Sequence, residues 1–319
     1  MTGKRIRPAG PLDLFALSVV PATALQLDLV LQLLSPYHTL QATLASWLRL
    51  REPLCALLYD GGHGLLACAH AHRCPSNPSW EVRYLAVWKE GLESAHTLWE
   101  ELLLGLGREA GRRGAARLLA YLPSEDHLEP FQRAGFRPFA EEILLLREGK
   151  EAAAGAQPTP ALRPIRDDDL WAIQQLYLSL TPPRVQQAEG SDSDSWQASQ
   201  GGEAWVWREA DQVQVYLRRR RASRGTVLNL LLDPACRQQA QAVLAYGLVG
   251  ARPPVYLVLR SYQGELLEVA RRLGFRIHAE QVLLGKQLTI ALEERPPVAA
   301  RGAERRFGAA PTTPSVGNH

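Results

Sequence analysis

The 319-residue chain has few lysines and cysteines and almost no methionine. Only four of its 36 basic residues are lysine, which leaves 32 arginines, and the single methionine is the first residue. Four cysteines are too few for a disulfide scaffold in a chain of this length, which indicates a reducing compartment. The formal net charge of +3 argues against a nucleic-acid partner, because proteins that bind polyanions carry a marked excess of basic residues.

Long apolar runs are also missing. A membrane helix needs about 20 consecutive apolar residues. The best candidate, near the N-terminus, is interrupted by Pro21, Gln26, Asp28 and Gln32. Hydrophobic residues make up 46% of the chain and charged residues 22%, which is typical of globular proteins. We therefore expect a cytoplasmic protein with no membrane partner.

What the chain does contain is an internal repeat. Residues 128–145 (LEPFQRAGFRPFAEEILL) align without a gap with residues 267–284 (LEVARRLGFRIHAEQVLL). The opening residues 6–17 align in the same way with residues 162–173. Two copies of one unit therefore follow each other. Because the second opening is internal, we interpret the basic and apolar N-terminus as a strand and a helix and not as a secretion signal.

The repeat divides the chain into four parts. Residues 1–147 form a first lobe, and residues 162–290 form a second. Between them, residues 148–161 are rich in Ala, Gly, Gln and Pro, the composition of a flexible linker. Residues 291–319 have no apolar period, so we expect a disordered tail.

Within each copy, short apolar runs alternate with helical patterns. In the first copy we expect strands at 53–59, 64–72, 80–87, 117–122 and 142–147, and helices at 98–111 and 127–134. In the second copy we expect strands at 204–208, 213–217, 227–232, 255–259 and 281–284, and helices at 237–247 and 264–273. The sequence predicts an α/β fold in which each lobe is a mixed, mostly antiparallel sheet flanked by helices.

This order of elements, together with the pairs Gly135-Phe136 and Gly274-Phe275, resembles the GCN5-related N-acetyltransferase family in a tandem arrangement. The resemblance implies an acyl-CoA-dependent N-acyltransferase, most simply one that moves an acetyl group from acetyl-CoA to a primary amine. The amine itself cannot be read from the sequence. The resemblance also implies that acetyl-CoA lies between the strands at 227–232 and 255–259 and that no metal takes part.

Members of that family bind the CoA pyrophosphate with a loop of the form (Gln/Arg)-x-x-Gly-x-(Gly/Ala), which opens a helix and presents its free N–H groups. Residues 237–242 match this form, except that Ala240 replaces the first glycine and its methyl group would crowd a phosphate. In the first copy, Thr97 and Trp99 occupy the positions of small residues, so we expect the second lobe to bind acyl-CoA. The cofactor-binding residues that the resemblance implies are Leu230, Leu232, Arg237, Gln238, Gln239, Ala240, Gln241, Ala242 and Gln263.

The catalytic groups depart from the family's pattern, because the position of its tyrosine acid holds Phe131 in one copy and Ala270 in the other. Tyr262, just after the strand at 255–259, is the candidate acid, and a core aromatic is the alternative interpretation. Glu81 resembles the glutamate base of some relatives, although it lies in the first lobe. These departures leave open a second hypothesis, a non-catalytic protein that interacts with partners or senses CoA esters.

Three clusters of residues have simple structural interpretations. Cys68, His70, His72 and Cys74 would share one face of a strand, where the two cysteines lie about 20 Å apart, so one zinc ion cannot bind all four. We interpret the segment as an ordinary strand face, with a metal site that takes two ligands from the His-x-His pair as the alternative. Arg218–Arg221 is interpreted as a solvated turn between two strands, with contact to an acidic partner or to the adenosine 3′-phosphate as the alternatives. Trp205 and Trp207 share one strand face and are expected in the core or between the lobes.

Overall fold

The computed structural model describes residues 5–9, 11–17, 21, 23–34, 53–60, 64–74, 78–88, 92–149, 161–190, 196, 202–222 and 224–288. The predicted tail and most of the predicted linker lie outside these residues. Within them, no helix is both long enough and apolar enough to cross a membrane.

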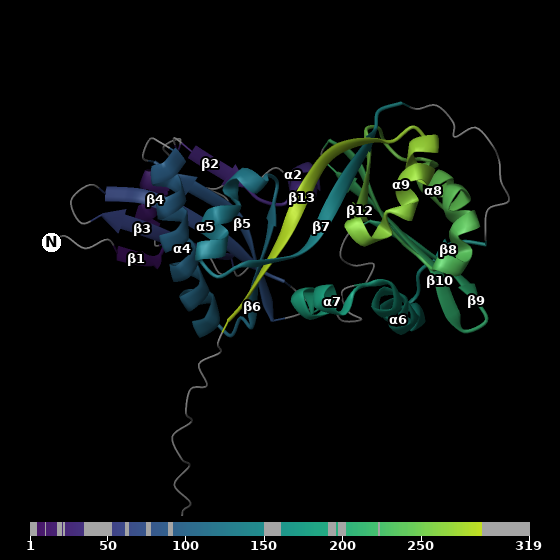
Figure 1. The fold of residues 1–319 in the computed structure, drawn as a ribbon, viewed down its shortest axis with the longest axis horizontal. Coiled ribbons are helices and arrows are strands. Elements are labelled where there is room, and N and C mark those ends of the chain that lie inside the picture. The colour runs from purple at the N-terminus through teal and green to yellow at the C-terminus, as the bar shows by residue number, and fades with distance from the viewer. Residues whose placement is uncertain are drawn as a thin grey trace, which may run out of the picture.

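The described residues form two lobes that share one continuous sheet (Figure 1). Lobe 1 contains the strands β1 (Arg5–Pro8), β2 (Thr23–Gln26), β3 (Pro53–Asp60), β4 (Gly64–Arg73), β5 (Ser79–Val87), β6 (Arg117–Leu122) and β7 (Arg137–Arg147). Its helices are α1 (Leu14–Leu17), α2 (Leu29–Leu34), α4 (Leu92–Arg112) and α5 (Leu128–Arg133), with the 3-10 turn η2 (Glu125–His127) before α5.

Lobe 2 repeats this order. Its strands are β8 (Arg163–Pro164), β9 (Glu203–Glu209), β10 (Gln212–Ala222), β11 (Gly225–Leu232), β12 (Val255–Arg260) and β13 (Arg276–Gln287). Its helices are α6 (Leu170–Leu180), α7 (Pro183–Glu189), α8 (Ala240–Leu248) and α9 (Glu265–Arg272), with the 3-10 segments η6 (Pro234–Gln239) and η7 (Ser261–Gln263) after β11 and β12.

The last strand of each copy crosses into the other lobe. The central order of the sheet is β6-β13-β7-β12, so β13 of lobe 2 pairs with β6 of lobe 1, while β7 of lobe 1 pairs with β12 of lobe 2. The two long strands also pair with each other, and they connect the lobes in Figure 1. Each lobe therefore completes its sheet with a strand from the other.

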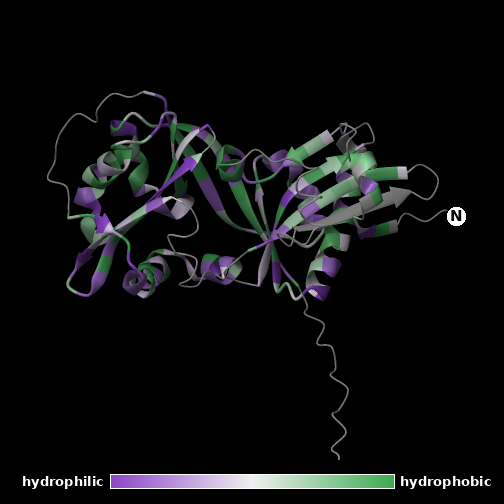
Figure 2. Ribbon diagram, turned by 180° about the vertical axis from the view of Figure 1, so that it is seen from behind, coloured by the Kyte–Doolittle hydropathy of each residue, from purple (hydrophilic) through white to green (hydrophobic). Residues whose placement is uncertain are grey.

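Helices cover both faces of the sheet in each lobe. The core of lobe 1 lies between its strands and the apolar faces of α4 and α5, and the largest core of lobe 2 lies between its strands and α8 and α9. On the opposite face of lobe 2, α6 packs on β9 and β10. Hydrophobic stretches, green in Figure 2, occur along strands and helices of both lobes.

The repeat is visible in matching side-chain contacts. At the start of lobe 1, Arg7 donates two hydrogen bonds to Asp13, at 2.7 and 2.6 Å. At the start of lobe 2, Arg163 donates two hydrogen bonds to Asp169, both at 2.7 Å. Paired bonds of this kind fix the first strand against the turn that follows it, so the two openings share geometry as well as sequence.

The two Gly-Phe pairs also adopt one conformation. Gly135 has φ 90° and Gly274 has φ 83°, a left-handed conformation that ends the preceding helix and strongly favours glycine. The amide of Phe136 donates to the Phe131 carbonyl at 2.9 Å, and that of Phe275 donates to Ala270 at 3.0 Å. Each pair thus reverses the chain from a helix into the strand that crosses between the lobes.

The predicted α/β fold with two sheet-and-helix lobes is confirmed, and every strand and helix predicted within the two copies has a counterpart. The differences lie at the ends: β7, β10 and β13 extend further than expected, and α8 begins at Ala240 after the 3-10 segment η6. Strand β2, which pairs with β5, was not predicted.

Candidate functional site

The candidate site lies where β11 and β12 part. The two strands pair in parallel from Thr226 to Asn229 and from Val255 to Val258. Beyond this point Gln263 bridges them, because its side-chain amide donates to the Leu230 carbonyl at 2.9 Å and accepts from the Arg260 amide at 3.0 Å. The proposed cofactor residue Gln263 is therefore already held at both of its polar atoms.

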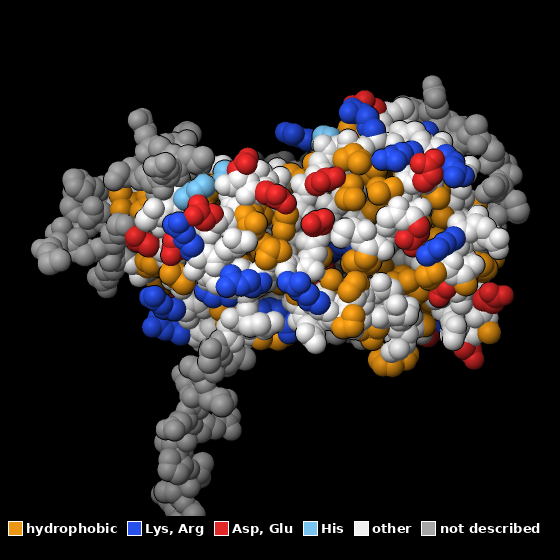
Figure 3. All heavy atoms as spheres, in the orientation of Figure 1, with side chains coloured by type: hydrophobic (Ala, Val, Ile, Leu, Met, Phe, Trp, Pro, Cys, Tyr) orange, Lys and Arg blue, Asp and Glu red, His pale blue; other side chains and the backbone are white. Residues whose placement is uncertain are grey.

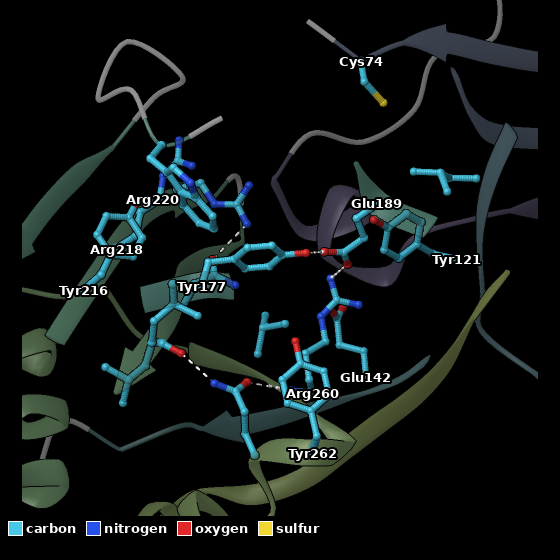
Figure 4. Close-up of a pocket in the computed structure, with 17 residues that line it drawn as sticks. Cys74, Tyr121, Glu142, Tyr177, Glu189, Tyr216, Arg218, Arg220, Arg260 and Tyr262 are labelled. Carbon is cyan, nitrogen blue, oxygen red and sulfur yellow. Dashed lines mark hydrogen bonds and ion pairs between the residues drawn. The ribbon is translucent and has the colours of Figure 1, made fainter. Parts of the chain in front are cut away.

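A cavity of about 310 Å³ opens beside this divergence (Figure 4). Both lobes line it. Lobe 1 contributes Leu119 and Tyr121 from β6, Glu142 from β7 and Cys74, and the rest of the lining belongs to lobe 2. The predicted acid Tyr262 lines the cavity, and its hydroxyl lies 3.5 Å from Thr181 Oγ1.

An ion-pair network forms one wall of the cavity. Arg260, at the end of β12, donates to Glu189 at 2.8 Å and lies 3.4 Å from Glu142, its cross-strand partner on β7. The hydroxyl of Tyr177 donates to the second oxygen of Glu189 at 2.6 Å. Gln281 donates to Glu142 at 2.6 Å. Strands from both lobes and the end of α7 thus hold two carboxylates around one guanidinium.

Burial shifts the proton affinities of these groups. It raises the pKa of Glu142, an effect that the charge of Arg260 opposes. It also raises the pKa of Tyr262, so this phenol keeps its proton at neutral pH. Burial alone would lower the pKa of Arg260, but Glu189 and Glu142 raise it above its usual value. The cavity therefore contains a protonated phenol close to a permanently charged guanidinium.

The arginine run forms the facing wall, which corrects the prediction of a solvated turn. Residues 218–221 lie inside β10 and pair with β11 on one side, while Arg218 and Arg219 also pair with β9. Alternation along the strand directs Arg218 and Arg220 to the cavity. Arg219 points to the other face, where it bonds Glu203 and the carbonyls that end α8. Apolar periodicity identified only the first half of this strand, at 213–217, because four arginines follow it.

The predicted pyrophosphate loop lies on the helix side of the divergence. Leu230 and Leu232 are buried in the core beneath α8 and α9. Arg237, in η6, is exposed, and its guanidinium lies 3.8 Å from the carboxylate of Glu265 at the start of α9. Ala240 has no exposed surface and packs in the same core, so its methyl group does not point outward as expected from the sequence. Ala242 is also buried, whereas Gln241 is partly exposed.

The equivalent place in lobe 1 is filled by aromatic rings. Trp99 is completely buried in α4, and the rings of His96 and His127 lie 5.3 Å from it. Phe131, at the family's tyrosine position, is also completely buried, as is its counterpart Ala270. The space between α4 and α5 is thus occupied by side chains, in contrast to the small residues of lobe 2.

Glu81, the carboxylate that the sequence suggested as a base, lies on β5 with its side chain 12% exposed. It is 3.5 Å from Arg83, and its Oε1 has no hydrogen-bond partner among the described residues. Asp28 is close by: burial, followed by the charge of Glu81, raises the pKa of Asp28 to about 7. Glu81 therefore belongs to a buried acidic pair in lobe 1, and it is absent from the lining of the cavity.

The remaining clusters lie on strands of the two lobes. Cys68 and His70 are buried on β4, where a bulge after His70 shifts the register of the segment. No group of three potential metal ligands occurs in the described part of the chain. Trp205 packs in the core of lobe 2 with Trp207 against it, as predicted. In Figure 3, acidic side chains gather across the upper middle of the visible face, and basic side chains gather below them.

Sequence reasoning missed the residues that define the cavity. Glu142, Tyr177, Glu189 and Arg260 lie in four separate elements, and none belongs to a motif. One signal was available for Arg260, a charged residue that ends the otherwise apolar run from Val255. A charge placed directly after a buried strand must find a partner, which points to residues elsewhere in the fold.

The chain was compared with known protein families, curated proteins and solved structures. No family model matches the sequence, and no curated protein matches it. Several solved structures match the fold of the chain. A GCN5-related N-acetyltransferase from Sphaerobacter thermophilus has a TM-score of 0.51 at 16% identity, with 89% of this chain and 95% of that chain covered. A tandem GNAT protein from the clavulanic acid biosynthesis pathway has a TM-score of 0.51 at 14% identity, covering 89% and 98%.

The chain has the fold of a tandem GCN5-related N-acetyltransferase. The fold inferred from the Gly-Phe pairs and the order of elements is confirmed over nearly the whole chain. At these identities the likeness extends to the fold alone, so activity and substrates have to be argued from this chain's own residues.

Proposed function

We propose that this protein is an acyl-CoA-dependent N-acyltransferase, in its simplest form an N-acetyltransferase, and that lobe 2 is the working lobe. One observation carries the proposal: the cavity at the divergence of β11 and β12 contains a carboxylate, Glu189, and a protonated phenol, Tyr262. These are the two kinds of group that an acyl transfer to an amine requires.

In this proposal acyl-CoA approaches from the side of α8 and α9, and the amine enters from the cavity. The acceptor nitrogen attacks the thioester carbonyl carbon, and the C–N bond forms as the C–S bond breaks. Glu189 takes the proton that the nitrogen loses. Tyr262, whose raised pKa keeps its proton in place, gives one to the leaving sulfur. The residues proposed to border the coenzyme are Leu230, Leu232, Arg237, Gln238, Gln239, Ala240, Gln241, Ala242 and Gln263.

Lobe 1 has a supporting part in this proposal. Trp99 occupies its equivalent of the coenzyme site, but Tyr121 and Glu142 line the lobe 2 cavity. We therefore assign lobe 1 to shaping the acceptor site.

The second candidate is a non-catalytic protein that senses CoA esters or interacts with partners. The ion pair between Arg237 and Glu265 favours it, because a carboxylate at the mouth of the divergence repels phosphates. Both side chains are well exposed, however, and a pair of this kind contributes at most about 1 kcal/mol, which a pyrophosphate can displace.

Calorimetric titration with acetyl-CoA tests the proposal, and we expect one site per chain. Gln241→Glu should weaken binding more than tenfold, since it adds a negative charge beside the phosphates. Gln241 is a better position for this than Ala240, because a carboxylate at the buried Ala240 would also unfold the helix. Thr97→Asp adds the same charge to lobe 1 at the exposed position of α4 that matches Ala240; it is the control and should leave the affinity unchanged.

The outcomes separate the candidates. No heat and no thermal shift at millimolar acetyl-CoA would refute coenzyme binding and leave the interaction hypothesis. Equal losses of affinity in the two acidic variants, at unchanged thermal stability, would show that the lobes are wrongly assigned. Binding without acetyl transfer to any amine would favour a sensor.

A further inference from the structure

The cavity carries opposite charges on its two walls, and this separation bears on the acceptor. In Figure 4, Arg218 and Arg220 lie on one side, while Glu189 and Glu142 lie on the other with Arg260 beside them. The lining contains three arginines and two glutamates. Arg260 is bonded to the glutamates, so the arginines of β10 form a separate positive wall.

Arg220 is held in place by a hydrogen bond, but one of its N–H donors has no partner among the described residues. Its Nη2 donates to the side-chain oxygen of Asn229 at 3.1 Å, a neutral acceptor. Its Nε is buried and has no hydrogen-bond partner among the described residues. A buried donor without a partner is costly unless a ligand or a water satisfies it. The side chain is therefore fixed by Asn229 with one donor left over beside the cavity.

The charges around Arg220 also favour a bound anion. Burial, followed by the charge of Arg218, lowers the pKa of Arg220, although Asp28 and Glu142 oppose this effect. Two guanidiniums on one strand face, two residues apart, repel each other. An anion placed between them would relieve that repulsion, and guanidinium groups bind carboxylates and phosphates through paired hydrogen bonds.

We propose that the acceptor is a small amine that also carries an anionic group, a carboxylate or a phosphate, which Arg218 and Arg220 bind while the amine faces Glu189. The inference rests on the proposed function for the transfer step, but the anion site itself does not require it. A volume of about 310 Å³ is at the lower end of small-molecule sites and suits a molecule of amino-acid size.

The experiment compares matched amines that differ only in the anionic group. L-tyrosine is paired with tyramine, and O-phosphoethanolamine with ethanolamine, and binding to the full chain is measured by calorimetry without coenzyme. We expect the anionic member of at least one pair to bind at least tenfold more tightly. The pair that shows the preference identifies the anion as carboxylate or phosphate.

Variants assign the preference to the positive wall. Arg220→Gln should reduce the preference to less than about threefold, since a charged hydrogen bond is worth tenfold or more, and Arg218→Gln should reduce it as well. Arg221→Gln, on the same strand but facing away from the cavity and exposed, is the control and should keep the preference. Thermal melts check that each variant is folded.

Equal affinity for both members of both pairs, including no detectable binding of any of them, would overturn the proposal. A preference that survives in Arg218→Gln and Arg220→Gln would overturn it too. The two proposals can fail independently. If the protein binds the anionic amine but not acetyl-CoA, the acyltransferase proposal is refuted, whereas the anion site is supported.

Discussion

Replacing Asp28 by Asn should remove a strong pH dependence of stability. Asp28 is buried beside Glu81, and its pKa is raised from 3.8 to about 7. The unfolded chain therefore loses the proton of Asp28 at lower pH than the folded chain does, so stability is full below pH 4 and falls as the pH rises to about 7. A pKa raised by about 3 corresponds to ~4 kcal/mol. This is an upper limit, because local rearrangement screens a buried charge.

Asparagine suits this position in every other respect. The Asp28 side chain accepts hydrogen bonds from the amides of Val30 and Leu31, at 2.9 and 3.2 Å, and the residue has φ 61°. An amide oxygen can accept the same bonds, and Asn tolerates the left-handed conformation. We therefore expect Asp28→Asn to match the wild type at pH 4 and to be more stable by about 2–4 kcal/mol at pH 8.

Urea unfolding at intervals from pH 4 to pH 8.5 measures this difference. Asp211→Asn, an exposed carboxylate in the turn between β9 and β10, is the matched control and should follow the wild type throughout. If the wild type and Asp28→Asn keep a constant difference across this range, Asp28 is ionised in the folded protein and the reasoning about the acidic pair is wrong.

Three further predictions concern single side chains. Asp169→Asn should destabilise the fold by about 3 kcal/mol at pH 7, because it removes a buried carboxylate bound by Arg163 and Arg208. The pKa of Asp169 is lowered despite burial, so this contribution is present above its usual value of 3.8 and is lost as the pH falls further; urea unfolding of the variant and the wild type should converge in acid. Glu265→Gln should tighten acetyl-CoA binding up to about fivefold in calorimetry, and weaker binding would show that Arg237 does not face the phosphates. Tyr262→Phe should lower kcat at least about 100-fold with unchanged acetyl-CoA affinity, and an unaltered kcat would exclude Tyr262 as the acid.

The fold could be predicted from the sequence because its signals are local. The turn at Gly135-Phe136 requires a left-handed glycine after a helix, and this requirement appears in the same form at Gly274-Phe275. Apolar periodicity likewise located the strands and helices of both copies. The exchange of β7 and β13 had no such signal, because each strand has the same apolar pattern whichever β-strand it pairs with.

The candidate site was only partly predictable for a related reason. Tyr262 was found through its position after a strand, but its neighbours in the cavity come from distant segments. The pairing of Glu142 with Arg260 depends on the strand exchange, which sets them opposite each other on β7 and β12. The arginines of β10 were misplaced because charge suggested a turn, whereas the pairing of that strand with β9 and β11 outweighs its composition.

Strand exchange also makes lobe 1 indispensable to the cavity in lobe 2. Without β7, the edge of β12 would be unpaired, and exposed edges of this kind are prone to aggregate. Arg260 would also lose Glu142, leaving a buried guanidinium with Glu189 alone. The cavity of lobe 2 is thus built on a strand that only lobe 1 supplies. Under the proposed function, the chemistry of lobe 2 therefore depends on a strand of lobe 1, and the two lobes form one folded unit.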